Sequence, residues 1–463
     1  MQPAAPQGLP TPTSPFPTTL GERFKLFMTL RDSRFEDLKP DRWKSIVYRD
    51  LSAGLIVALT AIPMAMGFAM AMGLRPEQGI IAGALSCIVG RTFGGSKYQV
   101  YGPTAAFIPV IAGLMAKYTS NGSTFAEAHG FLVLVSLLAG LVLMVLGLLG
   151  AGKYARVVPN SIVVGFTVGI AVSIAVSNLG EVLGMTTELK GNLVAKLVTV
   201  AGHLGEVNPW AVLIALLTFG ITKGLLRISV FIPAPLLSLA TATALSSTVL
   251  ASSGVRAVKD RFGSIPTDFF VFTPPHLPAW STSVMIDVAY YVVAIVFVSG
   301  VESLLCSSMA DRLADNKGTP FNPDKEFWGQ GLVQVVTPLI NGFPCTGALA
   351  RTATSIKAGA VTPLAGYFKS VLKLGMVYLI ASLLEQVPMA AIGGILLWVS
   401  SNMIKPSEIR ETVAEGRVEA GFMVYTAVMV PLTDFLTGVL SALVLYFAYR
   451  KLVVPRQESP HAA

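Results

Sequence analysis

From Leu51 onward, long apolar runs alternate with short polar loops along the chain. An apolar run of about 20 residues is long enough to cross the hydrocarbon core of a bilayer as one helix. The pattern therefore predicts an all-α polytopic membrane protein with about fourteen transmembrane segments, several of them too short to span alone. The predicted segments are 51–73, 78–92, 103–117, 131–149, 157–179, 209–226, 230–250, 284–306, 327–341, 345–358, 364–385, 387–404, 418–432 and 434–454.

Two of the short segments, the third and the tenth, begin in a similar way. The third begins Gly102-Pro103-Thr104-Ala105-Ala106, and the tenth begins Phe343-Pro344-Cys345-Thr346-Gly347-Ala348. If the chain divides into seven plus seven segments near residue 265, each is the third of its half, and the second half is inverted because seven is odd. Paired short segments interrupted by Pro or Gly point to the binding site of a transporter.

A half-helix that begins within the membrane leaves unpaired N–H groups and the positive end of its dipole there. Two such ends that face each other can bind an anion without any fixed charge. Thr104 and Thr346 add hydroxyl donors, and the small residues beside them allow a close approach to the backbone. The alternative is that these are ordinary proline kinks with small packing residues.

Arg351 follows Pro344 by seven residues and so falls within the tenth segment. A charge at the centre of the membrane costs at least ~2.5–3.5 kcal/mol on insertion scales, which makes it a candidate for function. In the interior it would attract the anion or pair with a carboxylate. Otherwise it is an arginine that reaches the membrane surface.

Glu302 is the one acidic residue between Asp287 and Asp311, well within the eighth segment. Because burial favours the neutral form of a carboxyl group, Glu302 is a candidate for exchanging a proton near neutral pH. It is equally a candidate for a structural partner of Arg351 or of backbone N–H groups. The same helix face could instead bind Na⁺.

Composition agrees with the membrane prediction: 53% of the residues are hydrophobic, 13% are charged, and mean hydropathy is +0.66. The net charge of +8 is explained by the positive-inside rule rather than by nucleic-acid binding. With a cytoplasmic N-terminus in the cell (inner) membrane, the loops after even-numbered spans carry Arg91, Lys97, Lys153, Arg156, Lys223, Arg227, Arg312, Lys317, Lys325, Lys405, Arg410, Arg417, Arg450, Lys451 and Arg456. The loop with Arg256, Lys259 and Arg261 fits least well.

No catalytic pattern emerges from the remaining residues. The three cysteines lie in or beside apolar runs, and the four histidines are scattered. There is no metal-ligand spacing, Ser–His pair or phosphate loop, so neither an enzyme nor a cofactor is predicted. Residues 1–20 are of low complexity and predicted to be disordered, and residues 21–50 alternate charge with apolar residues, as an amphipathic segment on the cytoplasmic membrane surface would.

Three stretches carry a resemblance to a known family. They are 62–113 (IPMAMGFAMAMGLRPEQGIIAGALSCIVGRTFGGSKYQVYGPTAAFIPVIAG), 301–313 (VESLLCSSMADRL) and 341–366 (NGFPCTGALARTATSIKAGAVTPLAG). Together they resemble the SulP anion transporters, known in animals as solute carrier family 26, over roughly residues 45–450.

The resemblance implies a transport domain over 51–454, built as a seven-plus-seven inverted repeat. A core of spans 1–4 and 8–11 would move against a gate of spans 5–7 and 12–14, in a homodimer. The family's anion site falls on Phe68, Thr104, Ala105, Ala106, Thr346, Gly347, Ala348, Leu349 and Arg351, and its coupling carboxylate falls on Glu302.

Two positions depart from the family pattern. Met64 stands where many members have Gln, which makes plain sulfate less certain as the substrate. Most members continue into a cytoplasmic STAS domain where this sequence has only the tail at 455–463, so either the sequence is truncated or this member lacks that domain.

The resulting hypothesis is a secondary transporter of a small anion, such as sulfate, bicarbonate or a dicarboxylate like fumarate, working by proton-coupled symport. The alternatives are a sodium-coupled symporter and an anion channel or exchanger of the same fold. A nucleobase:proton symporter would want an acid in span ten, where this chain has Arg351.

Overall fold

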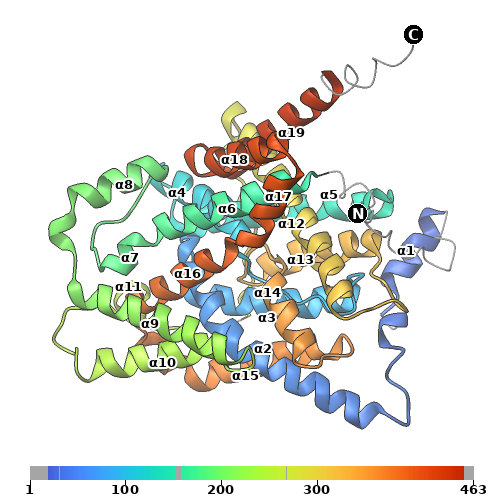
Figure 1. Cartoon of the computed structure of the whole chain (residues 1–463), viewed down its shortest axis with the longest axis horizontal. Coiled ribbons are helices and arrows are strands. Elements are labelled where there is room, and N and C mark those ends of the chain that lie inside the picture. The colour runs from blue at the N-terminus through green and yellow to red at the C-terminus, as the bar shows by residue number, and fades with distance from the viewer. Residues whose placement is uncertain (1–18, 31, 153–157, 267, 269, 453–463) are drawn as a thin grey trace.

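A computed structural model describes residues 19–30, 32–152, 158–266, 268 and 270–452. The predictions for residues 1–18, Arg31, Lys153, Arg156, Arg456 and the tail at 455–463 lie outside the described residues. The described chain is a bundle of helices in which early and late segments mix, as the blue and orange ribbons of Figure 1 show.

The elements of the first half include the predicted apolar helices and, in addition, a short strand at 101–102 and a helix at 193–202 that were not predicted. They are α1 (Leu20–Met28), η1 (Ser33–Phe35), α2 (Trp43–Ala71), α3 (Pro76–Phe93), β1 (Tyr101–Gly102), η2 (Ala105–Phe107), α4 (Ile108–Ser120), α5 (Phe125–Leu148), α6 (Asn160–Ser177), α7 (Leu179–Leu183), α8 (Leu193–Gly202), η4 (Leu204–Glu206), α9 (Pro209–Ile228) and α10 (Ala234–Ser247). The second half contains α11 (Val258–Phe262), α12 (Thr282–Leu313), α13 (Pro323–Leu339), β2 (Thr346–Gly347), α14 (Leu349–Lys357), α15 (Leu364–Glu385), α16 (Met389–Met403), α17 (Pro406–Glu415), α18 (Arg417–Leu432) and α19 (Phe435–Leu452).

All fourteen predicted segments coincide with helices, so the all-α polytopic fold is confirmed. Among the described residues, seven helices are long and apolar enough to cross a membrane alone. They are Trp43–Ala71, Phe125–Leu148, Asn160–Leu183, Pro209–Ile228, Thr282–Leu313, Leu364–Glu385 and Phe435–Leu452. The other predicted spans are shorter or more polar, and the count of fourteen crossings stays a prediction.

The ninth predicted segment begins earlier in the structure than the sequence predicted. The ninth segment was predicted from residue 327, but α13 begins at Pro323 because Asn322 caps the helix, with its side chain accepting from the N–H groups of Asp324 and Lys325. Lys325, predicted in a loop, and Glu326 therefore lie in the first turn of a helix. Both side chains are buried.

The helices form two sets by their packing. In one, α13 packs on α5 and α3, and α15 packs on α2 and α3; in the other, α18 packs on α6 and α19, and α9 packs on α16 and α10. Glycines permit the closest approaches: a Cβ atom at Gly140 would lie 2.6 Å from the Gly331 carbonyl oxygen, and one at Gly165 would lie 2.5 Å from that of Met423. Small residues at such contacts are typical of membrane helix bundles.

Two short strands, β1 packed on α3 and β2 packed on α12, pair with each other and are called the strand crossing below. β1 and β2 pair antiparallel, with Tyr101 opposite Gly347 and Gly102 opposite Thr346, and all four residues are buried. Each strand directly precedes a short helix: η2 and α4 follow β1, and α14 follows β2. A break in helical backbone within a membrane protein is tolerated where protein surrounds it and the freed backbone groups find partners.

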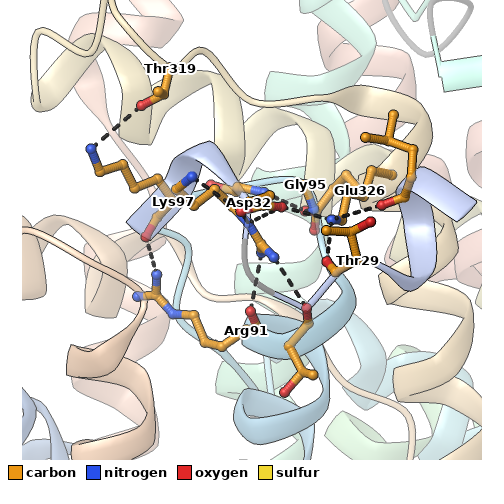
Figure 2. A network of polar contacts seen from close by, with 12 residues as sticks. Thr29, Asp32, Arg91, Gly95, Lys97, Thr319 and Glu326 are labelled. Atoms are coloured by element: carbon orange, nitrogen blue, oxygen red, sulfur yellow. Dashed lines mark hydrogen bonds and ion pairs between the residues drawn. The ribbon is translucent and has the colours of Figure 1, made fainter. Parts of the chain in front are cut away.

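The N-terminal segment packs on the protein's own helices rather than extending away from them. Phe24 and Phe27 lie against Trp328 of α13, with ring centroids 5.6 and 5.8 Å apart. The Lys325 ammonium donates to Thr29 O at 3.1 Å and to the Asp32 carboxylate at 2.7 Å (Figure 2). This segment therefore covers the helix ends near Trp328 and Lys325 of α13, a side that the sequence predicts to be cytoplasmic.

Arg34 completes that attachment. Its guanidinium donates to the carbonyl oxygens of Arg91 and Thr92 at 3.1 Å each, at the end of α3, and pairs with Asp32. Burial alone would raise the pKa of Asp32, but the hydrogen bonds and positive charges of Arg34 and Lys325 outweigh it, so the pKa lies below its usual value.

Candidate functional site

The two short helices after the crossing strands begin beside each other. Thr104 precedes η2 and Ala348 precedes α14, and neither helix start has a side-chain cap. The Ala348 N–H donates to Val100 O at 2.8 Å, which ties the start of α14 to the strand that leads into η2. Two helix N-termini, each carrying a partial positive charge, thus meet at the strand crossing.

The two threonines of the predicted site reach α12 instead of capping their own helices. The Thr104 hydroxyl donates to Glu302 Oε2 at 2.9 Å, and the Thr346 hydroxyl donates to Ser299 O at 3.1 Å. Thr104 is buried, whereas Glu302 is half-buried. The first half-helix is thereby joined directly to the one carboxylate predicted to take part in coupling.

Arg351 lies inside the protein, with 4% of its surface exposed. One terminal nitrogen, Nη2, donates to Pro103 O, and the other, Nη1, has no hydrogen-bond partner. A Cβ atom at Gly102 would lie 2.7 Å from Nη1, so this glycine leaves room for the guanidinium. This burial excludes the alternative in which the Arg351 side chain reaches the membrane surface. The side chain extends from the second half-helix to the backbone before the first.

The other predicted site residues surround these groups unevenly. Ala105, Ala106, Gly347 and Ala348 are buried at the two helix starts, and Phe68 is buried on α2. Leu349 is 37% exposed, at the first position of α14. The sequence left open that Glu302 is a structural partner of Arg351. Within the described residues, no ion pair joins these two side chains.

A buried carboxylate behind the strand crossing was missed from the sequence. Glu326 accepts from the hydroxyl groups of Tyr101 and Ser303 at 2.7 and 2.6 Å and from Gln99 Nε2 at 2.8 Å. It also accepts from the Gly95 N–H at 2.8 Å (Figure 2). A buried charge with this many donors is fully satisfied, so its role is to hold β1 against α12 and α13. The sequence signal was weak, because Glu326 stood just before a predicted span.

Two glutamines support the second strand in the same way. Gln334 Nε2 donates to Cys345 O at 2.7 Å, and its Oε1 accepts from the Cys345 N–H at 3.2 Å. Gln330 Nε2 donates to the same carbonyl. Cys345, Cys87 and Cys306 are free and buried, in keeping with a packing role.

Two buried lysines, Lys369 and Lys373, were also missed. They lie one turn apart on α15 and are 1% and 0% exposed. Here the signal was present, since two lysines four residues apart interrupt an otherwise apolar predicted span, and an ionisable residue within a membrane segment suggests a function.

A cavity of about 490 Å³ lies away from these groups. Its walls include Arg75, Glu77, His129 and His276, and it contains none of the predicted anion-site residues. The two adjacent helix starts, together with the unpartnered Nη1 of Arg351, are therefore the stronger candidate for an anion site.

The sequence of this chain is similar to the sequences of known transport proteins. Residues 47–428 match the model of the Sulfate permease family. The "Putative sulfate transporter YvdB" of Bacillus subtilis is 33% identical over 402 residues, covering 87% of this chain and 73% of that protein. The bicarbonate transporter BicA of a Picosynechococcus species is 27% identical over 359 residues, covering 77% of this chain and 61% of that one.

Two solved structures share the fold. The transmembrane domain of a cyanobacterial bicarbonate transporter BicA superimposes with a TM-score of 0.71 at 24% identity, covering 85% of this chain and 97% of that one. The structure of SLC26A9 superimposes with a TM-score of 0.77 at 16% identity, covering 92% of this chain and 68% of that one.

Proposed function

Because the chain belongs to the sulfate permease family, we propose that it is a secondary active transporter of a small anion. Members of the family are multi-pass membrane transporters rather than enzymes. The named relatives point to sulfate or bicarbonate as the transported ion. A small dicarboxylate such as fumarate is a further candidate, because its carboxylate oxygens would accept hydrogen bonds from the same donors.

One observation carries the proposal: Arg351 presents an unpartnered Nη1 beside two uncapped helix starts. A buried guanidinium nitrogen without an acceptor is unfavourable, and an oxyanion would supply an acceptor for Nη1. The helix N-termini of η2 and α14 would donate backbone N–H groups to the same ion. Phe68, Leu349 and the small residues Ala105, Ala106, Gly347 and Ala348 would form the walls.

Glu302 is the proposed coupling residue. Its hydrogen bond with Thr104 links protonation to the first half-helix, where the anion would bind. Protonation removes a negative charge from the site and so favours an incoming anion. The expected consequence is symport of anion and proton; sodium coupling and exchange are the alternatives.

The proposed movement is an elevator-like shift of a core, α2–α5 with α12–α15, against a gate of α6, α9, α10, α16, α18 and α19. The two packing sets described above support this division, because the crossing strands and both half-helices pack with the core helices. The proposal includes a homodimer in the cell (inner) membrane with both termini cytoplasmic.

The proposal is tested by tracer uptake into proteoliposomes that contain the purified full chain. Sulfate, bicarbonate, fumarate and chloride are compared with and without an inward proton gradient and with and without Na⁺. Saturable uptake that the proton gradient drives above equilibrium is expected for one of the anions. Uptake of none of them would contradict the anion site, uptake that never saturates would indicate a channel, and a strict Na⁺ requirement would move coupling from protons to sodium.

A further inference from the structure

Two segments that carry the chain between the proposed core and the proposed gate meet at one corner of the bundle. Residues 248–281 lead from α10 of the gate to α12 of the core and contain α11, and residues 386–388 lead from α15 of the core to α16 of the gate. The Val258 N–H of the first segment donates to Val387 O of the second at 2.9 Å. Both crossings are thus held together at the same end of the helices.

The part of the first segment before Gly263 is bound to the gate. Arg256 donates to the Met185 carbonyl oxygen, and Arg261 pairs with Glu181 of α7, the short helix that follows α6. Figure 1 shows α11 on the same side of the molecule as α7 and α9. These two arginines belong to the loop that fits the positive-inside rule least well, and their contacts give them a local role. This part of the segment should move with the gate.

The part after Gly263 is bound to the core instead. The Ile265 N–H donates to Glu385 Oε1 at 2.7 Å, at the end of α15, and the Thr273 N–H donates to Leu339 O at 2.8 Å, at the end of α13. The Ile265 side chain is buried in a hydrophobic cluster that α2, α3 and α15 form. Hydrogen bonds and burial therefore change from one body to the other across a few residues.

The change falls on a residue with unusual backbone freedom. Gly263 has φ +72° and ψ −158°, a region that is essentially restricted to glycine, and a Cβ atom there would meet nothing within 4 Å. The second segment changes partners at the matching point: Glu385 binds the core part of the first segment, Val387 binds α11, and Gln386 alone stands between them. Each segment thus has one residue at which its attachment passes from core to gate.

We propose that Gly263 and Gln386 form a single hinge about which the core tilts against the gate, so that this corner stays in place while the opposite helix ends move. The inference rests on the proposed movement of core against gate. The four peptide steps from Glu385 to Met389 reach at most about 14 Å when fully extended. Extending them would break the bonds of Glu385 and Val387, so α15 and α16 cannot slide far past each other at this end.

Away from the corner, the contacts between the two bodies offer little polar resistance to such a tilt. Within the described residues, one side-chain hydrogen bond joins a core helix to the gate helices, from the Tyr290 hydroxyl of α12 to Asp434 before α19. The aromatic contact of Phe297 with Phe435 lies on the same boundary. Hinge residues are expected to absorb the change in backbone angles while the packed helices on either side move as units.

The test measures two distances that span core and gate, using spin labels on introduced cysteines in the full chain. The corner pair is Lys259 of α11 with Leu383 of α15, and the far pair is Leu313 at the end of α12 with Leu452 at the end of α19; all four side chains are exposed. Double electron–electron resonance is recorded in lipid with sulfate, with bicarbonate and with neither. The far pair should change its distance distribution between conditions, and the corner pair should keep one distribution.

Gly263→Ala tests the hinge by its effect on turnover. Alanine at positive φ costs roughly 1–2 kcal/mol, which lowers the population of this conformation and should slow uptake by about 5- to 30-fold. Gly122→Ala is the matched control, because Gly122 also has positive φ, at +91°, and a Cβ atom there meets nothing within 4 Å. Gly122 lies between α4 and α5, both of the core, so its strain is the same throughout the cycle and turnover should stay near the wild-type value.

The outcomes separate the hinge from the proposed function. Uptake of no anion in the panel would contradict the transporter itself. In a chain that does transport, a shift of both distances together would show a translation without a pivot, and two unchanged distances would show no such movement; either result overturns the hinge. Equal turnover of Gly263→Ala and Gly122→Ala also overturns it. Should Gly263→Ala fail to fold, the distance measurement still decides, because it leaves both hinge residues intact.

Discussion

At the scale of single residues, the neighbours of Arg351 fix the orientation of its buried guanidinium. Gly102 leaves room for its guanidinium, Pro103 accepts one of its hydrogen bonds, and Nη1 is left for a ligand. A planar guanidinium presents its donors in a fixed geometry, which a lysine at the same position cannot reproduce.

Arg351→Ala should therefore raise the KM for the transported anion by about 10- to 100-fold, the value of a hydrogen bond to a charged group. Arg351→Lys should recover part of the affinity, since it restores charge without the second donor. Initial uptake rates in proteoliposomes give the KM. An unchanged KM in a folded Arg351→Ala protein would make this residue structural.

Glu302 is the second residue on which function depends. Glu302→Gln mimics the protonated carboxyl group and can still hydrogen-bond with Thr104, so it should bind and exchange the anion. It should fail to accumulate anion when a proton gradient is imposed. Counterflow and gradient-driven uptake are measured in the same vesicles, and accumulation by the variant would exclude Glu302 as the coupling group.

At the scale of elements, the strand crossing depends on the absence of a side chain. A Cβ atom at Gly347 would lie 2.6 Å from Gln99 Cδ and 2.9 Å from Cys306 Cβ. Gln99 directly precedes the segment leading into β1 and Cys306 lies in α12, so a side chain at Gly347 would push β2 away from both.

Gly347→Val is expected to abolish uptake while the protein still inserts into the membrane. Gly113→Ala is the matched control, since a Cβ atom at Gly113 of α4 meets nothing within 4 Å. Uptake and membrane abundance are measured for both. Normal transport by Gly347→Val would show that the strand crossing is not part of the anion site.

The stability that the N-terminal segment adds to the fold is predicted to depend on pH. Because Arg34 and Lys325 hold the pKa of Asp32 below its usual value, the ionised carboxylate stabilises the fold above about pH 4, and this contribution is lost as pH falls through the lowered pKa. Asp32→Asn leaves two buried cations without their partner, at a cost of about 3–5 kcal/mol.

Asp32→Asn should thus lower the thermal midpoint of the detergent-purified protein at pH 7, and the difference from the wild type should shrink toward pH 3. Asp41→Asn is the control, because the Asp41–Arg42 pair is 67–79% exposed and exposed pairs contribute little. A difference that persists at pH 3 would show that the carboxylate charge is not responsible.

At the scale of the whole molecule, the proposed movement of core against gate predicts which contacts must change. Phe297 of α12 and Phe435 of α19 have ring centroids 6.2 Å apart and join the two proposed bodies. Phe131 of α5 and Tyr291 of α12, at 6.5 Å, lie within the core.

Cysteines at 297 and 435, joined by a short reducible cross-linker, should arrest transport until reductant is added. The same treatment at 131 and 291 should leave transport largely intact, because those helices would move together. Transport that continues through the 297–435 cross-link would rule out a movement at this boundary.

The sequence predicted the helices well and the site in part. The fourteen apolar segments all became helices because a bilayer leaves no other way to pair the backbone of a single apolar run. Thr104, Arg351 and Glu302 stood out since proline breaks and charges are rare in such runs. Glu326 did not, because its donors come from Gly95, Tyr101 and Ser303, and nothing local reveals that convergence.

What the sequence alone determined is where the helices lie along the chain: apolar runs long enough for membrane helices, and two short segments whose Pro and Gly residues interrupt the helix. Only the tertiary structure decided which groups meet. Arg351 touches Pro103 across 248 residues, and Lys369 touches Tyr101 across 268. The physical reason is that the periodicity of a run fixes its own conformation, whereas the balance of buried charges depends on partners that only packing brings together.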